Sequence, residues 1–382
     1  MLGAATCIGP GCEIGAEGPV TLDDCQLADD VTLAGGFFTG SVFLSGVSFG
    51  SCGHVRPGSI LEEQVSCAHA VGLKQTVLMP HVVLGSLVNF CDCLMAGGTD
   101  SRNHSEVGSS FVHFNYTPHR DKATASMLGD VPRGVMLDQP PIFLGGQGGL
   151  VGPVRIEFGT VIAAGTVCRR NVGEPGHMVS GGSLAAWKRR GYEPGVYGDI
   201  SRTLVNNLSY IGNLHAFFHW YDHVRRHFMS GKPHLAACHE GALSRIRLLI
   251  HERGLRLTEL AGNLIHSLRI AREKFDADLS APPFVLQEEF VARWPEISKK
   301  MQPETTGESG QTHRGKFLDS IEKPSECASY LTTIKALSAT QKRQGTRWLQ
   351  VVADDVADQL KPLGIGKGAV GPATDRSRGA EE

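Results

Sequence analysis

An apolar residue returns at every sixth position along much of the first half of the chain. A period of six is neither the 3.6 residues of an α-helix nor the two-residue alternation of a single strand. It is typical of a solenoid in which each six-residue unit is a short strand followed by a turn. The sequence therefore predicts an all-β solenoid. The residues expected to point into its core are Ile8, Ile14 and Val20; Phe37, Phe43, Phe49, Val55 and Leu61; Val65, Val71, Val77 and Val83; and Leu144, Leu150, Ile156, Ile162 and Cys168.

Charge and hydropathy exclude several classes of partner. The 382 residues carry a formal net charge of −2, so no basic field favours nucleic acid. No run of about 18 apolar residues occurs, so no membrane span is expected. The N-terminus lacks the basic and apolar segments of a signal peptide. The ten cysteines form no C-x-x-C pair, which favours free thiols in a reducing compartment. A cytoplasmic location is therefore expected.

The chain divides into three regions by composition. Residues 1–180 form the solenoid, with a loop insertion at about 115–141 that is rich in Pro, Gly and charge. Residues 199–280 have apolar spacings of three and four, typical of amphipathic helices, and form a helical lobe that ends at Pro282-Pro283. Residues 281–382 read as a linker, a short helix and a disordered tail.

Two cations on the solenoid have a spacing with physical meaning. Three six-residue strands make one triangular coil, so Arg56 and Lys74, eighteen residues apart, fall on one edge in adjacent coils. Strands in a sheet lie about 4.8 Å apart, so the two side chains converge. Paired cations suit the phosphate of a sugar phosphate or nucleotide sugar. The alternative is two solvated surface cations.

Several motifs together resemble one enzyme family. The matching pieces are Arg56-Pro57-Gly58, Lys74, Asn115-Tyr116, Lys122, residues 150–154, residues 162–166 and residues 170–174. In this combination the solenoid resembles the acetyltransferase half of bifunctional UDP-N-acetylglucosamine pyrophosphorylase / glucosamine-1-phosphate N-acetyltransferase. The resemblance implies a left-handed parallel β-helix of hexapeptide repeats, followed here by a small α-helical lobe and a flexible tail. It also implies a homotrimer with active sites between solenoids.

The resemblance assigns roles to individual residues. Arg56 and Lys74 match residues that hold the sugar nucleotide. Asn115 and Tyr116 would line the site for the co-substrate acetyl-CoA, and Lys122 would reach its phosphates. The other positions that match the cofactor site are Gly146, Ala163 and Ala164. Gly146 stands where the family often has a serine near the thioester. Ordinary packing on the solenoid wall would explain Tyr116 and the two alanines equally well.

The expected catalytic base is missing from its usual place. Acetyl transfer to an amine needs a general base near the attacking nitrogen, and histidine suits neutral pH. The family has a histidine directly after an Ala-Gly pair, but Gly98 occupies that position here. His104 and His113 are the nearest candidates to replace it. Each could instead be a surface or packing histidine.

The helical region carries His215, His219, His223 and His227, each four residues apart. Histidines at this spacing share a helix face and can bind zinc. Successive steps of four residues drift around the helix, so all four cannot reach one ion. A packing role is favoured, and no metal is predicted for the solenoid.

Two functions remain open from the sequence. The first is acetyl transfer from acetyl-CoA to an amino sugar phosphate, in UDP-N-acetylglucosamine metabolism. The alternative is a non-catalytic solenoid that binds a nucleotide sugar or scaffolds a separate nucleotidyltransferase domain. Because the repeats begin almost at Met1 and solenoid ends need a cap, either a partner covers this end or a preceding domain has been lost.

Overall fold

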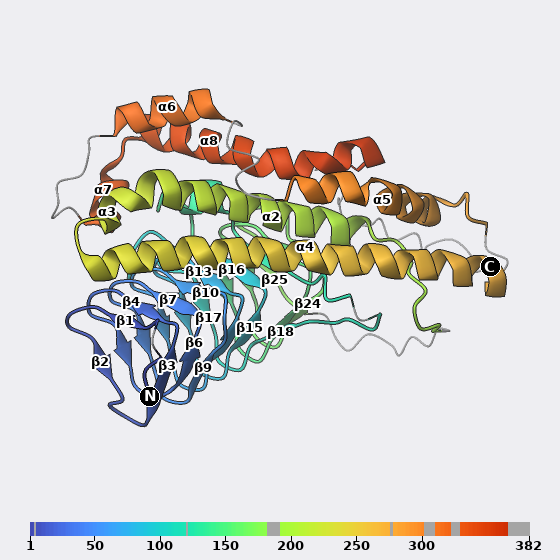
Figure 1. The fold of residues 1–382 in the computed structure, drawn as a ribbon. Helices are drawn as coiled ribbons and strands as arrows, with labels where there is room; N and C mark the ends of the chain where they lie inside the picture. Colours follow the sequence, from blue (N-terminus) through green and yellow to red (C-terminus); the bar gives the residue numbers. More distant parts are fainter. Residues whose placement is uncertain are drawn as a thin grey trace.

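The first half of the chain is a three-sided parallel β-solenoid. A computed structural model describes residues 1–3, 5–119, 121–181, 192–275, 278–301, 310–321 and 329–365. Within these residues, consecutive strands fall in turn on three all-parallel sheets, so that three strands complete one coil (Figure 1). The fold class predicted from the period of six is confirmed.

The strands of each sheet follow one another along the solenoid axis. Sheet 1 consists of β1 (Cys7–Ile8), β4 (Gln26–Leu27), β7 (Ser41–Phe43), β10 (Ser59–Leu61), β13 (Val77–Leu78), β16 (Cys93–Met95), β19 (Ser126–Leu128) and β22 (Arg155–Ile156). Sheet 2 consists of β2 (Glu13–Ile14), β5 (Thr32–Leu33), β8 (Ser48–Phe49), β11 (Ser66–Cys67), β14 (Val83–Leu84), β17 (Glu106–Val107), β20 (Phe143–Leu144), β23 (Val161–Ile162) and β25 (Met178–Val179). Sheet 3 consists of β3 (Val20–Asp23), β6 (Gly36–Thr39), β9 (Gly53–Val55), β12 (Gly72–Lys74), β15 (Asn89–Cys91), β18 (Val112–Phe114), β21 (Gly149–Val151) and β24 (Val167–Cys168).

The predicted core positions are largely correct. The run from Leu144 to Cys168 is buried throughout, and so are Phe43, Phe49, Val55 and Leu61. Two positions were predicted wrongly. Phe37 is 40% exposed and Val83 faces outward, while the next residues, Phe38 and Leu84, are buried. The coils there are shorter than 18 residues, since Ser66 pairs with Val83, so a strict period of six slips by one.

Solvent reaches one end of the solenoid core. Ile8 and Ile14 are 37% and 38% exposed, although their register partners Leu27 and Leu33 are fully buried. The first coil is flanked by another coil on one side only, so its inward side chains lack half of their neighbours.

The expected loop insertion is two excursions rather than one. After residue 114 the chain leaves the wall, returns as β19 in sheet 1, and leaves again through the short helix α1 (Val131–Gly134). Asp130 caps α1, because its side chain accepts from the backbone N–H of Arg133. A third excursion, residues 96–105, lies between β16 and β17.

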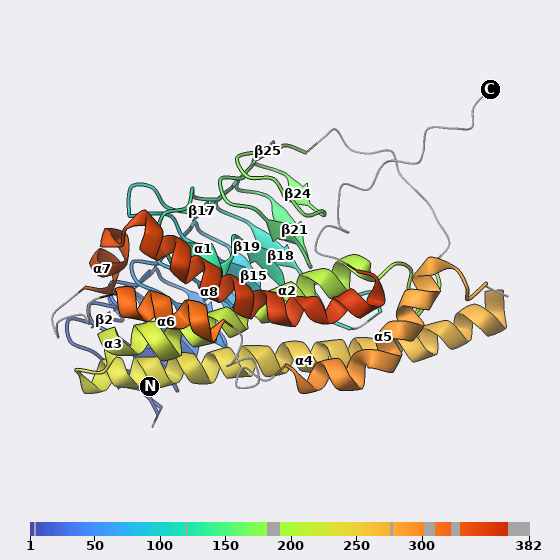
Figure 2. The ribbon, with the colours of Figure 1, turned by 90° about the horizontal axis from the view of Figure 1, so that it is seen from above.

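The helices that follow the solenoid, expected as a helical lobe, form a layer over sheet 1 (Figure 1). Its members are α2 (Ser201–Trp220), the π-helical turn η1 (Tyr221–Arg225), α3 (Arg226–Met229), α4 (Pro233–Phe275), α5 (Pro282–Lys299), α6 (Gln311–Ser320), α7 (Tyr330–Ala336), α8 (Ala339–Ala357) and the 3₁₀ turn η3 (Asp358–Leu363). In the view from above, α8 crosses over α2 (Figure 2), and α4 lies on the other side of α2 (Figure 1). Helix α2 is therefore buried along most of its length. No helix among the described residues is long and apolar enough to cross a membrane.

Two details of the helical layer differ from expectation. Pro282 and Pro283 do not end the helical region but occupy the first turn of α5, where a missing N–H costs no hydrogen bond. The short helix expected within residues 281–382 is not a single element: Ser338 and Gln341 form a capping box that starts α8 as a helix separate from α7. The predicted tail lies mostly beyond residue 365, outside the described residues.

Buried ion pairs join the helical layer to the solenoid. The Arg253 guanidinium of α4 donates to the Asp92 carboxylate at 2.7 Å, and both side chains are almost fully buried. Arg225 of η1 donates to Glu63 at 2.6 Å and lies between the rings of Tyr221 and Tyr330. Since an unpaired buried charge is costly, these contacts fix how the helices lie on sheet 1.

Candidate functional site

The turn from sheet 3 into sheet 1 of the next coil, called here the 3–1 corner, carries the paired cations. Val55 of β9 and Leu73 of β12 are register partners that point into the core. Arg56 and Lys74 follow them directly, so the eighteen-residue spacing places both at this corner in adjacent coils. Arg56 is exposed and Lys74 is half-buried. Both can therefore meet a ligand from solvent.

Cys91 extends this row by one coil, since it is the register partner of Lys74. Burial raises the pKa of the Cys91 thiol, and Asp92 adds to this, while the Asn115 side chain and the charges of Lys74 and Arg56 oppose it. The thiol is therefore neutral at physiological pH. These influences also show that Arg56, Lys74 and Asn115 share one neighbourhood. Sequence reasoning missed Cys91, which only the strand register brings into the row.

The predicted cofactor loop leaves the wall at the same corner. Asn115 follows β18, and its side-chain oxygen accepts from the Thr124 hydroxyl at 2.9 Å, which ties the two ends of the loop together. Tyr116 is 66% exposed. Lys122 is exposed, and its carbonyl accepts from Arg253 of α4. The loop is thus held from both the solenoid and the helical layer.

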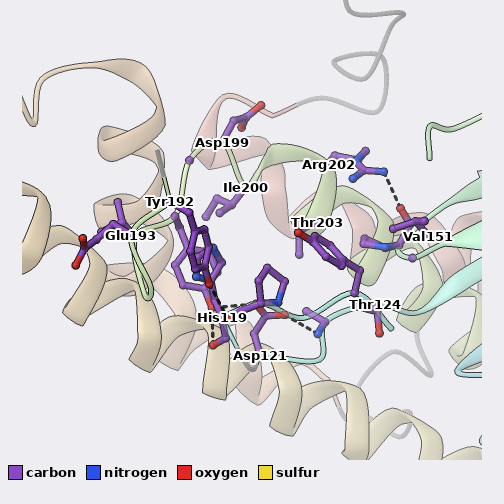
Figure 3. Close-up of a pocket in the computed structure, with 18 of the residues that line it drawn as sticks. His119, Asp121, Thr124, Val151, Tyr192, Glu193, Asp199, Ile200, Arg202 and Thr203 are labelled. Carbon is purple, nitrogen blue, oxygen red and sulfur yellow. Dashed lines mark hydrogen bonds between the residues drawn. The ribbon is translucent and has the colours of Figure 1, made fainter. Parts of the chain in front are cut away.

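A cavity of about 950 Å³ opens beside this loop. Its walls come from residues 151–153 of the solenoid, from residues 192–203, from Phe275 at the end of α4 and from six residues of the loop: Tyr116, Pro118, His119, Asp121, Ala123 and Thr124 (Figure 3). Tyr116 is the predicted cofactor residue that lines it. The contribution of residues 192–203 was not foreseen, because no motif marks that segment.

His119 lies in an aromatic part of the cavity wall, and its Nδ1 accepts a hydrogen bond. The backbone N–H of Gly195 donates to His119 Nδ1 at 3.1 Å, so a neutral ring carries its proton on Nε2. Burial lowers the pKa of His119, which keeps the ring neutral. Tyr192 and Tyr197 pack against the ring, with centroids 5.9 and 4.5 Å away. The Tyr197 hydroxyl donates to Asp121 at 2.9 Å.

Arg202, near the start of α2, is the cation in the cavity wall. Its Nη1 donates to the carbonyl oxygens of Pro153 and Arg169, at 3.2 and 2.8 Å. Among the described residues, no carboxylate lies within ion-pair distance of it, and Nε and Nη2 donate to no group. Burial lowers the pKa of Arg202, but it remains a charged donor. Arg202 lies across the cavity from Tyr192, with its guanidinium beside the segment that carries Val151 (Figure 3).

His104 lies at a different corner, between sheets 1 and 2, called here the 1–2 corner. Its Nδ1 is 3.0 Å from the Ser101 carbonyl, so Nδ1 carries the proton and Nε2 keeps a free lone pair. Glu106 lies 3.5 Å from Nε2 and would stabilise the protonated ring. Within one chain, the structure does not bring His104 to the corner of Arg56 and Lys74.

Gly98 packs directly against the backbone of His104. A Cβ built on Gly98 would lie 2.6 Å from His104 Cα and 1.8 Å from the Asn103 carbonyl oxygen. A histidine cannot stand at residue 98 unless this excursion moves. The backbone of Asn103 and His104 fills the space in which that side chain would begin.

His113 lies inside the solenoid rather than in an open cleft. It is the register partner of Leu150 in an inward-facing row and is only 4% exposed. Its Nε2 is 2.8 Å from the Ser126 hydroxyl. Burial lowers its pKa to about 4, with Asp92 opposing, so the ring is neutral at physiological pH. In this conformation His113 cannot contact a substrate.

The remaining predicted cofactor residues lie at the third corner, between sheets 2 and 3. Gly146 follows β20, Ala163 and Ala164 follow β23, and the Gly146 carbonyl accepts from Gly165 N–H at 2.9 Å. The structure therefore separates them from Asn115 and Tyr116 within one chain.

Three histidines of the row in the helical layer, His215, His219 and His223, are engaged in packing, and the fourth, His227, is exposed. His215 is fully buried, with Nε2 3.1 Å from the Met301 carbonyl. His219 and His223 stack at 5.8 Å, and Arg314 approaches His223 at 2.9 Å. Within the described parts of the chain, no group of three His, Cys, Asp or Glu side chains could hold a metal ion.

Comparison with known proteins confirms the resemblance of the solenoid. No family model matches the chain. It is 30% identical over 173 residues to the bifunctional protein GlmU of Trichlorobacter lovleyi, covering 45% of this chain and 33% of that protein. The GlmU proteins of Pelobacter propionicus and Nocardia farcinica are 29% identical over 168 and 198 residues, covering 44% and 51% of this chain and 32% and 36% of theirs. The matched region is the C-terminal acetyltransferase half of GlmU. The chain thus spans about a third of the length of these relatives.

Proposed function

We propose that this protein is a hexapeptide-repeat acyltransferase that moves an acetyl group from acetyl-CoA to the amino group of a sugar phosphate. One observation carries the proposal: Arg56, Lys74 and Asn115 lie at the same corner of the solenoid, and Tyr116, next to Asn115, lines a cavity. The similarity of the solenoid to the acetyltransferase half of GlmU supports the reaction class. Glucosamine 1-phosphate is the first acceptor to test.

The phosphate of the acceptor would lie between Arg56 and Lys74. Both positions are open to solvent and one coil apart, so their charges add over a single phosphate. Asn115, Tyr116 and Lys122 would hold acetyl-CoA on the adjoining loop. No metal takes part in this scheme.

His104 would be the general base. With Nδ1–H donating to Ser101, the Nε2 lone pair can take a proton from the attacking amine. The amine nitrogen bonds to the thioester carbonyl carbon, and a backbone N–H stabilises the oxyanion. The C–S bond then breaks, and the sulfur leaves as a thiol with the proton returned by the imidazolium. Glu106 stabilises that imidazolium in between.

The arrangement of the corners favours a site shared between copies. Arg56 and Lys74 lie at the 3–1 corner, His104 at the 1–2 corner, and Gly146, Ala163 and Ala164 at the third. A neighbouring copy that presents its own corner would complete the set. A homotrimer, as the family resemblance implies, would do this by symmetry.

The alternative is a solenoid that binds a nucleotide sugar without catalysis. Gly98 favours it, because the histidine of the family is absent and the local backbone has no room for one. In that case His104 would only orient the excursion at residues 96–105.

The test is release of free thiol from acetyl-CoA in the presence of glucosamine 1-phosphate. We expect release by the parent protein and a loss of roughly 10²–10⁴-fold in His104→Ala. His251→Ala is the control, since His251 is an exposed histidine of α4 and lies at none of the three solenoid corners. Full activity in His104→Ala would exclude it as the base. No transfer by the parent to any amino sugar phosphate would leave the binding function in its place.

A further inference from the structure

The cavity beside the predicted cofactor loop is built only in part by that loop. Half of its wall comes from residues 192–203, which lie after the solenoid and belong to the helical part of the chain. Tyr197 N–H donates to Ser267 of α4 and its hydroxyl to Asp121 of the loop, so this segment is fixed to both. The second half of the chain therefore builds part of a site on the first.

One wall of the cavity suits a flat ring. Tyr192 is 60% exposed and stacks on His119, and Tyr197 packs against the same imidazole with ring centroids 4.5 Å apart. Tyr116 adds a second exposed ring to the lining. Stacking on such faces tolerates any nucleobase, because every base has a π-face. The Nε2–H of the neutral His119 ring adds a hydrogen-bond donor.

The opposite wall suits an anion. Arg202 keeps Nε–H and Nη2–H donors that no described residue uses, and no described carboxylate forms an ion pair with it. The two carbonyl contacts of Nη1 hold the guanidinium in place. Three acids line the cavity, and each has another partner: Asp121 accepts from Tyr197, Glu193 pairs with Lys274 at 2.7 Å, and Asp199 accepts from the Ser201 N–H at 2.8 Å. Of the three, Asp199 also acts on the charge of Arg202 from beyond ion-pair distance.

We infer that this cavity binds a phosphorylated nucleoside, with the base on the Tyr192–His119 wall and a phosphate on Arg202. The inference rests on the proposed function in one respect, since acetyl-CoA carries such a group at one end. A nucleotide sugar carries one as well. The cavity adjoins Asn115 through Thr124, so a nucleotide bound there lies next to the predicted transfer site.

Calorimetric titration tests the inference with four probes: coenzyme A, adenosine 3′,5′-bisphosphate, UDP and unphosphorylated adenosine. The parent should bind coenzyme A and the bisphosphate if the source is acetyl-CoA, or UDP if it is a nucleotide sugar. Arg202→Gln should lower the affinity for the phosphorylated probe by roughly 10- to 100-fold and leave the affinity for adenosine unchanged. Tyr192→Ala should lower the affinity for the nucleotide and for adenosine alike, by roughly 5- to 100-fold.

Matched controls separate binding from folding. Arg269→Gln removes an exposed arginine of α4, and Phe37→Ala removes an exposed ring of sheet 3; neither lines the cavity, so both should bind like the parent. Arg202→Lys keeps the charge and should recover part of the affinity. Thermal melting of each variant shows whether the loss of the Pro153 and Arg169 contacts has unfolded the segment.

The outcomes distinguish this inference from the proposed function. If the protein transfers no acetyl group but binds a nucleotide through Arg202 and Tyr192, the nucleotide site is supported and the proposed acetyltransferase activity is refuted. If acetyl transfer occurs and both variants keep the parent affinity for coenzyme A, the nucleotide site is refuted and the proposed acetyltransferase activity stands. A parent that binds none of the phosphorylated probes, or loss of adenosine and nucleotide together in Arg202→Gln, would overturn the inference.

Discussion

Replacing Asp92 by Asn should loosen the helical layer from the solenoid. Asp92 stands at the 3–1 corner and accepts from Arg253 at 2.7 Å, and the two side chains are 5% and 2% exposed. Asn has the same shape and tolerates the positive φ of 60° found at this corner. The substitution therefore removes the negative charge with little change in backbone preference.

The structure sets the size of the effect. Breaking a buried pair by removing one partner costs about 3–5 kcal/mol, because the other charge stays buried. Two neutral acceptors remain near Arg253, the Gln75 side chain at 3.3 Å and the Lys122 carbonyl at 3.4 Å. They compensate in part, so we expect the lower end, about 3 kcal/mol.

Equilibrium unfolding in urea, followed by tryptophan fluorescence, measures this loss. The double variant Asp92→Asn/Arg253→Met should be more stable than Asp92→Asn alone, because no charge is left buried. Glu273→Gln is the matched control, since its pair with Arg269 is 60% and 56% exposed, and it should cost less than about 0.5 kcal/mol. A loss below about 1 kcal/mol in Asp92→Asn, or no recovery in the double variant, would refute the reasoning.

Three further outcomes are expected. Ile156→Asp places an unpaired charge in the solenoid core and should abolish cooperative thermal melting, whereas Val167→Asp at an exposed position should melt close to the parent; near-parent melting of Ile156→Asp would contradict the inward register. Since burial lowers the pKa of His113 to about 4, the unfolded chain takes up its proton first as the pH falls; stability should be full above pH 6.5 and drop from there toward pH 4, and urea titrations should show a smaller drop in His113→Leu. An equal drop in that variant would place the titration elsewhere. Arg56→Ala should weaken calorimetric binding of glucosamine 1-phosphate by roughly tenfold or more at unchanged melting temperature, and equal affinity would remove Arg56 from the site.

The period of six was enough to predict the solenoid because each inward position is buried by the coils on both sides. It could not predict the slip at Val83, since the coil length changes by one residue without any marker in the sequence. Nor could it show that β19 returns to sheet 1 within the supposed loop, because Ser126 to Leu128 is only three residues long.

Only part of the candidate site could be predicted from the sequence, for a similar reason. Arg56 and Lys74 could be paired because their spacing equals one coil. Tyr192 and Arg202 reach the cavity through tertiary contacts with the Asp121 loop and the Pro153 carbonyl, and no local pattern encodes such contacts. The burial of His113 follows from its register with Leu150, which lies beyond the excursions that obscured the alignment.

The central claim is an acetyltransferase site completed by a second copy, and subunit complementation tests it most directly. At a low concentration of glucosamine 1-phosphate, Arg56→Ala should keep at most about a tenth of the parent rate of thiol release and His104→Ala at most about a hundredth, because each lacks one half of every site. If the two variants are unfolded, mixed in equal amounts and refolded together, one interface in four pairs an intact Arg56 with an intact His104, so roughly a quarter of the parent rate should return. Mixtures as inactive as the separate variants, beside an active parent, would contradict a shared site.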